Sequence, residues 1–208
     1  MSAADVQPNE HDRFVLRQRI RPIVNQYEFS LPTEDGKPGE AFCFVEQARF
    51  KFKEDIRFYA DESKQHELLR IKARQRFDPR ARYDVTDASG QTIGEIQKVF
   101  GKSLVRSTYG ILDPQGQELA IAQERNPIVA LFRRIIGFIP YIGDFADFLP
   151  IPYHFDFVRG GETIGSHRRR IGPFRDVYDI DMSGDSERAI DRRMVLAIAV
   201  GMDALQAR

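Results

Sequence analysis

The fold of this protein is decided by its last apolar stretch, DRRMVLAIAVGMDAL, which runs from Asp191 to Leu205. Between Met194 and Met202 this stretch contains no charged or polar side chain. A helix at a protein surface has one apolar and one polar face, whereas a helix made from this stretch is apolar on every face. It is also too short to span a bilayer, which takes about 20 apolar residues. The stretch therefore predicts a helix that other parts of the chain surround.

The overall composition is that of a protein with a packed core. The chain has 208 residues, of which 42% are hydrophobic and 30% are charged, and these values are typical of a folded domain rather than a disordered chain. Its 31 basic and 31 acidic residues give a formal net charge of zero. A neutral molecule does not attract nucleic acid as a whole, so we expect no nucleic-acid partner.

The N-terminal sequence and the single cysteine indicate where the protein resides. The sequence MSAADVQPNEHD lacks the basic start and the apolar run of a secretory signal. We expect residues 1–11 to form a disordered arm and residues 12–208 to form a single domain. Cys43 is the one cysteine, which excludes disulfide bonds within the chain and fits a reducing compartment. The predicted location is the cytoplasm, with peripheral attachment to a membrane as a further option.

Four turn-like stretches recur every 26 residues, and each contains an aspartate: Asp35, Asp61, Asp87 and Asp113. The Asp, Gly, Pro and Ser residues in these stretches favour tight turns. The segments between them alternate apolar and polar residues, as strands with one buried face do. Around the last turn the apolar members are Tyr109 and Ile111 on one side and Leu119 and Ile121 on the other. The repeat therefore predicts a series of β-hairpins.

The regular spacing fails after the fourth turn, because the next turn comes 18 residues too late. The extra residues begin with Asn126 and Pro127, which are favoured at the cap and at the first position of a helix. Apolar side chains then recur at helical spacing. We therefore expect a helical insertion at 126–153. The chain returns to strands after it and closes with the apolar helix, which we place at 186–206.

The number of predicted strands determines the architecture. A sheet of ten or more strands curls up or closes, and a closed barrel of that size has an interior wider than its own side chains fill. A helix that is apolar on every face suits this interior. The predicted fold class is therefore mainly β, with a closed antiparallel barrel around a central apolar C-terminal α-helix.

The sequence also resembles a known family. Three stretches, RFKFKEDIRFYADE, RIKARQRFDPRARYDVTDASGQTIGEI and GKSLVRSTYGILDPQGQELAIAQE, together with the last apolar stretch, resemble the LURP-one-related family over most of residues 12–206. The resemblance implies a barrel of about twelve strands around a central C-terminal helix. The family shares this fold with tubby C-terminal domains, which bind phosphoinositides, and with phospholipid scramblases, which are linked to calcium-dependent lipid movement.

The sequence lacks enzyme signatures. The tripeptide GKS at 101–103 has the ending of a phosphate-binding loop, but Ile96 stands where that loop needs a glycine. The chain contains no G-x-S-x-G, H-E-x-x-H or paired C-x-x-C motif. We therefore predict that the protein is not an enzyme.

Two basic stretches are candidate sites for an anion or a lipid head group. In RIKARQR alternate residues are cationic and would share one face of a strand: Arg70, Lys72, Arg74 and Arg76. This stretch resembles the basic strand with which tubby domains meet phosphoinositide head groups. In SHRRRIGPFR the candidates are Arg168 and Arg170. The alternatives are a solvated outer face paired with glutamates of neighbouring strands for the first stretch, and an exposed hairpin end for the second.

The expected insertion offers candidate membrane contacts. Its apolar face with a neighbouring arginine pair is the pattern of a helix that lies in a membrane interface. The candidates are Phe132, Arg133, Arg134 and Ile136. The alternative is that the same apolar face docks over one mouth of the barrel.

A calcium site is one further candidate, in the stretch DIDMSGDSE. Its acidic residues match the early spacing of a calcium-binding loop: Asp179, Asp181, Asp185 and Glu187. Scramblases carry an acidic calcium segment just before their last helix. The twelfth position of such a loop needs a glutamate and is Ile190 here. The alternative is that Asp185 or Ser186 caps the last helix, and no other cofactor is expected.

These observations favour a non-enzymatic β-barrel module that binds anionic phospholipid head groups or a protein partner at a membrane surface. One alternative is a scramblase-like, calcium-responsive lipid transporter, in which the central helix would have to leave the barrel. The other is a soluble regulatory or scaffold protein without a lipid role.

Overall fold

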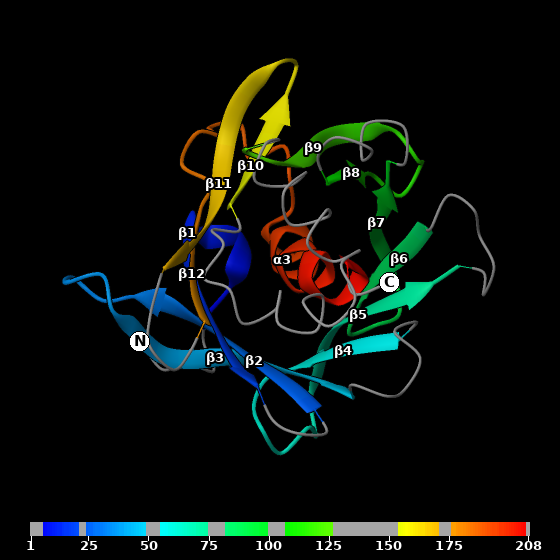
Figure 1. The fold of residues 1–208 in the computed structure, drawn as a ribbon. Coiled ribbons are helices and arrows are strands. Elements are labelled where there is room, and N and C mark those ends of the chain that lie inside the picture. Colours follow the sequence, from blue (N-terminus) through cyan, green and yellow to red (C-terminus); the bar gives the residue numbers. More distant parts are fainter. Residues whose placement is uncertain are drawn as a thin grey trace, which may run out of the picture.

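Twelve antiparallel strands follow one another around a closed barrel, and one helix fills its interior (Figure 1). The structure is a computed structural model that describes residues 6–20, 24–48, 55–74, 82–99, 107–126, 154–170 and 176–206. The strands are β1 (Arg13–Ile20), β2 (Val24–Pro32), β3 (Pro38–Ala48), β4 (Asp55–Tyr59), β5 (Glu67–Ala73), β6 (Arg82–Asp87), β7 (Thr92–Lys98), β8 (Thr108–Leu112), β9 (Glu118–Glu124), β10 (His154–Arg159), β11 (Glu162–Arg170) and β12 (Asp176–Asp181). A short 3₁₀ helix, η2 (Pro8–Glu10), precedes β1, and the central helix is α3 (Arg192–Gln206).

Pairing between the first and the last strand closes the barrel. Each strand pairs with the next one in the sequence, and β1 pairs with β12, where Phe14 lies opposite Ile180. Closure leaves no strand edge that other chains could extend. The predicted fold class, a closed antiparallel barrel of about twelve strands around a C-terminal helix, is confirmed.

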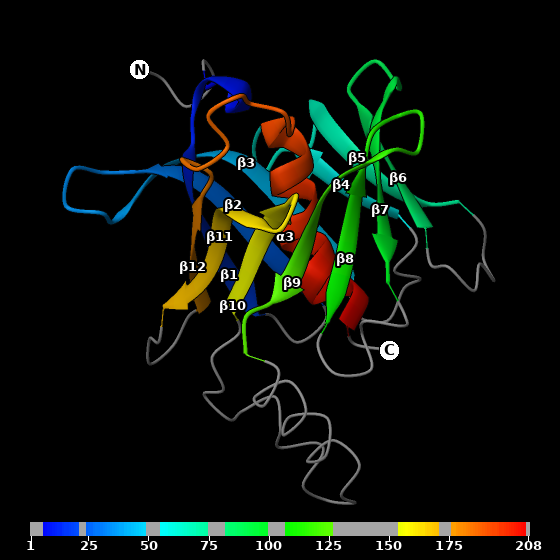
Figure 2. The same ribbon diagram turned by 90° about the horizontal axis from the view of Figure 1, so that it is seen from above.

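Helix α3 runs through the barrel and is buried on all sides (Figures 1 and 2). Every side chain from Met194 to Val200, and that of Met202, is no more than 2% exposed. The strand residues that share this core are mostly aromatic or branched, such as Phe29, Phe58 and Ile71. The predicted apolar helix surrounded by other parts of the chain is therefore confirmed.

The inner face of β9 differs from the expected strand pattern. Leu119 and Ile121 are the apolar members of the sequence alternation, but the fully buried side chains are the alanines on either side of Ile121. One of them, Ala122, lies between Tyr109 of β8 and Phe157 of β10 in the strand ladder. A small side chain at this position leaves room for two large rings, so size complementarity decides which face of β9 is buried.

The repeated turns share one pattern of hydrogen bonds. Oδ1 of Asp113 accepts hydrogen bonds from two backbone amides of its turn, those of Gln115 and Gln117, and Asp87 makes the equivalent pair. A glycine with positive φ lies three residues after each of these two aspartates, with a φ of +82° at Gly90 and +80° at Gly116. Glycine adopts this conformation without strain, whereas the Asp61 turn has Lys64 at the same position, with a φ of +59°.

The first turn departs from the predicted aspartate repeat. Thr33, rather than Asp35, takes the equivalent position, because Oγ1 of Thr33 accepts the hydrogen bond from the amide of Lys37. Gly36 follows three residues after Thr33, with a φ of +72°. The repeat of 26 residues therefore relates Asp61, Asp87 and Asp113 to one another but does not include Asp35.

Helix α3 begins later than its predicted range of 186–206. Its first residue is Arg192, because Asp191 is the N-cap and accepts a hydrogen bond from the amide of Arg193 at 2.8 Å. Asp185, one of the two expected caps, instead binds two backbone amides of the preceding turns.

The expected disordered arm is partly folded. Residues 6–11 contain η2, Val6 packs against the core, and the side chain of Asn9 accepts a hydrogen bond from the amide of Arg192. The expectation was wrong for these residues because they supply partners to the start of α3. Residues 1–5 and all but the first residue of the expected insertion at 126–153 lie outside the described residues.

The alternating direction of the strands divides their connections between the two ends of the barrel (Figure 2). We call the side where α3 begins the start end. The connections that meet strand ends there follow β2, β4, β6, β8, β10 and β12, and residues 6–12 meet the beginning of β1 on the same side. We call the opposite side, where α3 finishes, the finish end. The connections that meet strand ends there follow β1, β3, β5, β7, β9 and β11.

Replacing Gly94 of β7 with alanine is expected to destabilise the protein by about 1–3 kcal/mol. A Cβ atom there would lie 2.7 Å from the carbonyl oxygen of Leu112 and 2.8 Å from the side chain of Met194 on α3, so strand and helix would have to move apart. Gly110 of β8 is the matched control, because a Cβ atom there meets its nearest neighbour at 3.5 Å. Urea unfolding measures both variants, and equal effects of Gly94→Ala and Gly110→Ala would contradict the close approach.

Candidate functional site

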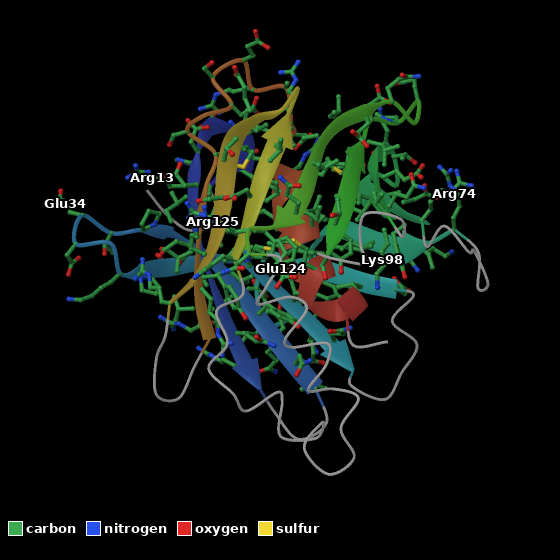
Figure 3. The ribbon with its side chains drawn as sticks, turned by 45° about the horizontal axis from the view of Figure 1, so that its top comes forward. Arg13, Glu34, Arg74, Lys98, Glu124 and Arg125 are labelled. Carbon is green, nitrogen blue, oxygen red and sulfur yellow. The ribbon has the colours of Figure 1, made fainter. Side chains whose placement is uncertain are left out.

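The first predicted basic stretch forms strand β5, with its cations on the outer surface of the barrel. Leu69 and Ile71 point into the core and are 2% and 1% exposed, whereas Arg70 and Lys72 alternate with them and face outward. Arg74 follows the strand and points away from α3 (Figure 3). The three cations therefore lie along one line on the outer face, toward the finish end.

Acidic side chains of neighbouring strands hold two of these cations. Arg70 makes two hydrogen bonds to Asp55 of β4, each 2.7 Å long, and these are the main reason why the pKa of Asp55 lies below its usual value. Arg74 lies 2.9 Å from Asp84 of β6 and 3.0 Å from Glu95 of β7. Apart from Glu95, these side chains are 29–39% exposed, and ion pairs of that exposure contribute only about 0–1 kcal/mol each.

Lys72 differs from its two neighbours. Its side chain is exposed and makes no ion pair with any residue that the structure describes. The backbone of Lys72 lies opposite Asp55 and Asp84 in the flanking strands, but both carboxylates are bound to arginines. The described part of the basic stretch therefore offers one uncommitted cation beside two arginines in exposed ion pairs.

The second basic stretch joins neighbouring segments of the barrel to one another. Arg168 of β11 lies 2.5 Å from Asp156 of β10 and donates a hydrogen bond to the carbonyl oxygen of Phe155. Arg170 binds Asp179 of β12 and donates to the carbonyl oxygen of Gly36 at 2.7 Å, at the tip of the β2–β3 hairpin. These contacts account for both arginines without an anion.

The four candidate calcium ligands each bind a different arginine. Asp179 pairs with Arg170, Asp181 with Arg13 at 3.2 Å, Asp185 with Arg192 at 2.6 Å, and Glu187 with Arg159 at 3.0 Å. Within the part of the chain that the structure describes, no three His, Cys, Asp or Glu side chains come together as metal ligands. The arrangement of these acidic residues is that of separate ion pairs rather than that of a calcium loop.

A buried arginine at the start of α3 was not among the predicted site residues. The side chain of Arg192 is 1% exposed and lies between Asp185, which is also 1% exposed, at 2.6 Å and Asp12 at 2.7 Å. Burial alone would raise the pKa of Asp185, but the hydrogen bonds from Arg192 and from two backbone amides lower it below its usual value. No local sequence signal identifies this cluster, because Asp12 and Arg192 lie 180 residues apart.

The remaining predicted site residues lie outside the described ranges: Arg76, Phe132, Arg133, Arg134 and Ile136. Within the described ranges, no helix combines the length and the apolar character that a membrane crossing requires.

The connections assigned to the two ends of the barrel differ in the charge of their sequences, which the net charge of zero conceals. At the start end, residues 6–12 and the six connections contain ten acidic and three basic residues. The acidic residues are Glu10, Asp12, Glu34, Asp35, Asp61, Glu62, Asp113, Asp185, Glu187 and Asp191. The basic residues are Lys37, Lys64 and Arg188.

The six connections that belong to the finish end have the opposite composition, with thirteen basic and four acidic residues in their sequences. The basic residues are Arg21, Arg49, Lys51, Lys53, Arg74, Arg76, Arg80, Lys102, Arg106, Arg125, Arg133, Arg134 and Arg175. The acidic residues are Glu54, Asp78, Asp144 and Asp147. The alternation between acidic and basic connections was already present in the sequence. The strand topology was needed to assign the acidic connections to one end of the barrel and the basic connections to the other.

Buried polar side chains lie on the inner face of the wall near the finish end. Glu124 lies in the last position of β9 and is 1% exposed (Figure 3). Gln18 and Gln47, which come near the ends of β1 and β3, are 5% and 7% exposed. These polar residues occupy the same inward positions of the strand alternation that apolar residues fill elsewhere, so sequence periodicity did not distinguish them.

His167 of β11 is buried within an aromatic cluster. Its ring stacks on Tyr178 with the ring centres 4.8 Å apart, and Phe155 lies 6.5 Å away. Neither ring nitrogen has a hydrogen-bond partner among the described residues. Burial lowers the pKa of His167 to about 3, with smaller contributions from His154 and Arg168, so the native protein holds this imidazole in its neutral form.

Comparison with known proteins identifies the family. A family model described as LURP-one-related matches residues 42–203, which is more than half of the chain. The chain belongs to the LURP-one-related family. The match begins within β3. The first two strands therefore precede the matched region, although this LURP-one-related chain needs them to close its barrel.

This LURP-one-related chain is also similar to AtMg01280, an uncharacterized mitochondrial protein of Arabidopsis thaliana. The two are 29% identical over 108 residues, which cover 51% of this chain and 33% of that protein. The matched region therefore spans about a third of the length of that relative.

The stability of the protein is expected to fall by about 2–3 kcal/mol between pH 6.5 and pH 4.5 through His167. The unfolded chain takes up a proton at this residue near pH 6.5, whereas the native state does so only near its pKa of about 3. The contribution is therefore complete above pH 6.5 and is lost as the pH falls. Urea unfolding at several pH values measures it, and His167→Phe is expected to flatten the dependence.

His66→Gln, which replaces an exposed histidine, is the control variant for this measurement. A pH dependence that survives in His167→Phe would show that other groups cause it.

Proposed function

We propose that this protein is a non-enzymatic barrel module that binds an anionic phospholipid surface with its finish end. The observation that carries the proposal is the difference in sequence charge between the connections that the strand order assigns to the two ends. A molecule without net charge is not drawn to a membrane from afar, but one basic end and one acidic end orient it near a negative surface. The basic connections would then lie next to the lipid phosphates, and the acidic start end would face away.

The described residues nearest to that end support this orientation. Lys72 is exposed and makes no ion pair with a described residue, and Arg74 is a partly exposed arginine that pairs with Asp84 and Glu95. Each lysine or arginine close to an anionic surface contributes about 1 kcal/mol of attraction. A few such residues give reversible binding that weakens as salt screens the charges.

Three carboxylates oppose the same attraction. Asp55, Asp84 and Glu95 lie on the outer face among the cations of β5. They reduce the local positive charge and occupy the guanidinium groups of Arg70 and Arg74. We therefore expect moderate affinity that is controlled by these acidic residues, rather than a deep site that encloses a single head group.

Two observations weigh against the alternatives. A scramblase-like activity that moves α3 out of the barrel would expose side chains that are now no more than 2% exposed, and each large apolar one costs about 1.5–3 kcal/mol to expose. The acidic residues that would sense calcium are bound to four separate arginines. A protein partner with an acidic surface uses the same chemistry as the lipid, and the experiments below separate the two.

The charge reversal Lys72→Glu is expected to weaken binding to anionic vesicles about tenfold or more, because it replaces one attractive charge of about 1 kcal/mol with a repulsive one. Co-sedimentation with vesicles of neutral lipid, and of neutral lipid with phosphatidylserine or a phosphoinositide, measures the effect at two salt concentrations. The matched control is Lys37→Glu, an exposed lysine of the start end.

Equal losses in Lys72→Glu and Lys37→Glu would contradict the proposed orientation. If the unmodified protein binds no anionic vesicle at low salt, the lipid proposal is wrong, and a protein with an acidic surface becomes the partner to seek.

Removing one opposing charge is expected to strengthen the interaction. Asp84→Asn takes away a carboxylate that holds Arg74, and affinity for anionic vesicles should rise about two- to fivefold, in line with about 1 kcal/mol or less per charge. Glu34→Gln changes the charge equally at an exposed position of the start end and should have no effect. Because misfolded protein also sediments, the gain must disappear at high salt and without vesicles, and failure of Asp84→Asn to produce such a gain would count directly against the role of β5.

A further inference from the structure

We propose that residues 6–11 form a detachable strap over the start of α3, which opens and closes while the barrel remains folded. The strap is attached mainly through Asn9. Its Oδ1 atom accepts a hydrogen bond from the amide of Arg192 at 2.7 Å, and its carbonyl oxygen accepts one from the side chain of Arg188. One residue of the strap thus connects two positions at the opposite end of the sequence.

The other attachments of the strap are the packing of η2 against α3 and the half-buried side chains of Val6, Pro8 and His11. Helix η2 contains no buried residue, and Val6 is only partly buried where it packs against the core. The backbone hydrogen bonds of Glu10 and His11 go to Gln7 and Pro8, so they lie within the strap itself. A segment with few buried apolar contacts opens at a much smaller free-energy cost than the core of the same protein.

The barrel keeps its own contacts when the strap opens. The carbonyl oxygen of Asp12 accepts a hydrogen bond from the amide of Met182 at 2.7 Å, and its carboxylate binds Arg192. The N-cap Asp191 and the buried pair of Arg192 with Asp185 involve no strap residue. Asp12 is therefore the hinge, and the opening ends there.

Opening changes the start end in two ways. The amide of Arg192 is one of the first amides of α3, which have no acceptor within the helix, and it loses the acceptor that Asn9 supplies. The surface that Val6 covers also becomes accessible. The strap thus regulates access to the first turn of α3, at the end of the barrel opposite to the one that we propose faces the membrane.

Amide hydrogen exchange of the full chain, followed by NMR, tests the strap. In Asn9→Ala the amides of Glu10, His11 and Arg192 are expected to exchange at least fivefold faster, while those of Val195–Val200 and of the strands keep their rates. Gln7→Ala is the matched control, because it truncates another exposed amide side chain of the strap, and that side chain makes no hydrogen bond to a described residue. Asn9→Asp keeps the acceptor at the start of a helix, where a negative charge is favourable, and should restore slow exchange.

Two outcomes would overturn the proposal. If Asn9→Ala accelerates exchange equally in the strap, in α3 and in the strands, the strap belongs to the cooperative unit of the barrel and does not open separately. If it leaves the amides of Glu10, His11 and Arg192 unchanged, Asn9 does not hold the strap.

Discussion

The structure depends on the enclosure of one helix that is apolar on every side. A helix with a polar face can rest on a single sheet, but α3 has no face that water can cover, since Met194 to Val200 are all buried. Only a wall that surrounds the helix satisfies this constraint, and a closed barrel of twelve strands supplies it. The same constraint determines details of the wall. Glycine is needed at position 94, where the strand packs against Met194, and the small Ala122 lies between two aromatic residues of the neighbouring strands.

Enclosing the helix creates a second requirement at its first turn. The first amides of a helix have no acceptors within it, and the first residue of α3 also brings a charge into the protein. A buried charge is tolerated only with partners, and breaking such a pair by removing one member costs about 3–5 kcal/mol. Asp185 and Asp12 neutralise Arg192, while Asp191 and Asn9 accept the amide hydrogens. The start of the chain is thereby tied to its end, in addition to the pairing of β1 with β12.

The sequence was informative wherever a local pattern carries the structure. The alternation of apolar and polar residues predicted the strands, and the aspartate and glycine pairs predicted most of the turns. The helix that is apolar on every face predicted the closed barrel. It failed where the partner is distant in the sequence. Asn9 looked like part of a polar arm, because nothing near it in the sequence indicates Arg192. Arg168 and Arg170 looked available for an anion, because Asp156 and Asp179 become their neighbours only when the strands pair. The inner face of β9 was not predictable either, since the choice of alanine over leucine depends on the rings of β8 and β10.

The candidate site shows the same limit in another form. The cations of β5 were visible in the sequence, whereas the carboxylates that oppose them come from β4, β6 and β7. The alternating charge of the connections was also present in the sequence, but the net charge of zero was used there only to exclude nucleic acid as a partner. Assigning each connection to an end changes that interpretation, because what matters near a charged surface is where the charges lie.

The central claim is that α3 and the barrel form one cooperative unit, in which the helix is the core and not a removable part. Native-state hydrogen exchange of the amides of Val195–Val200, measured over a series of low urea concentrations, tests it most directly. If the claim is correct, these amides exchange only through global unfolding, with the free energy and the urea dependence of the whole protein. Exchange through an opening that has a lower free energy and a smaller urea dependence than global unfolding would contradict the claim. The helix would then separate from a barrel that remains folded.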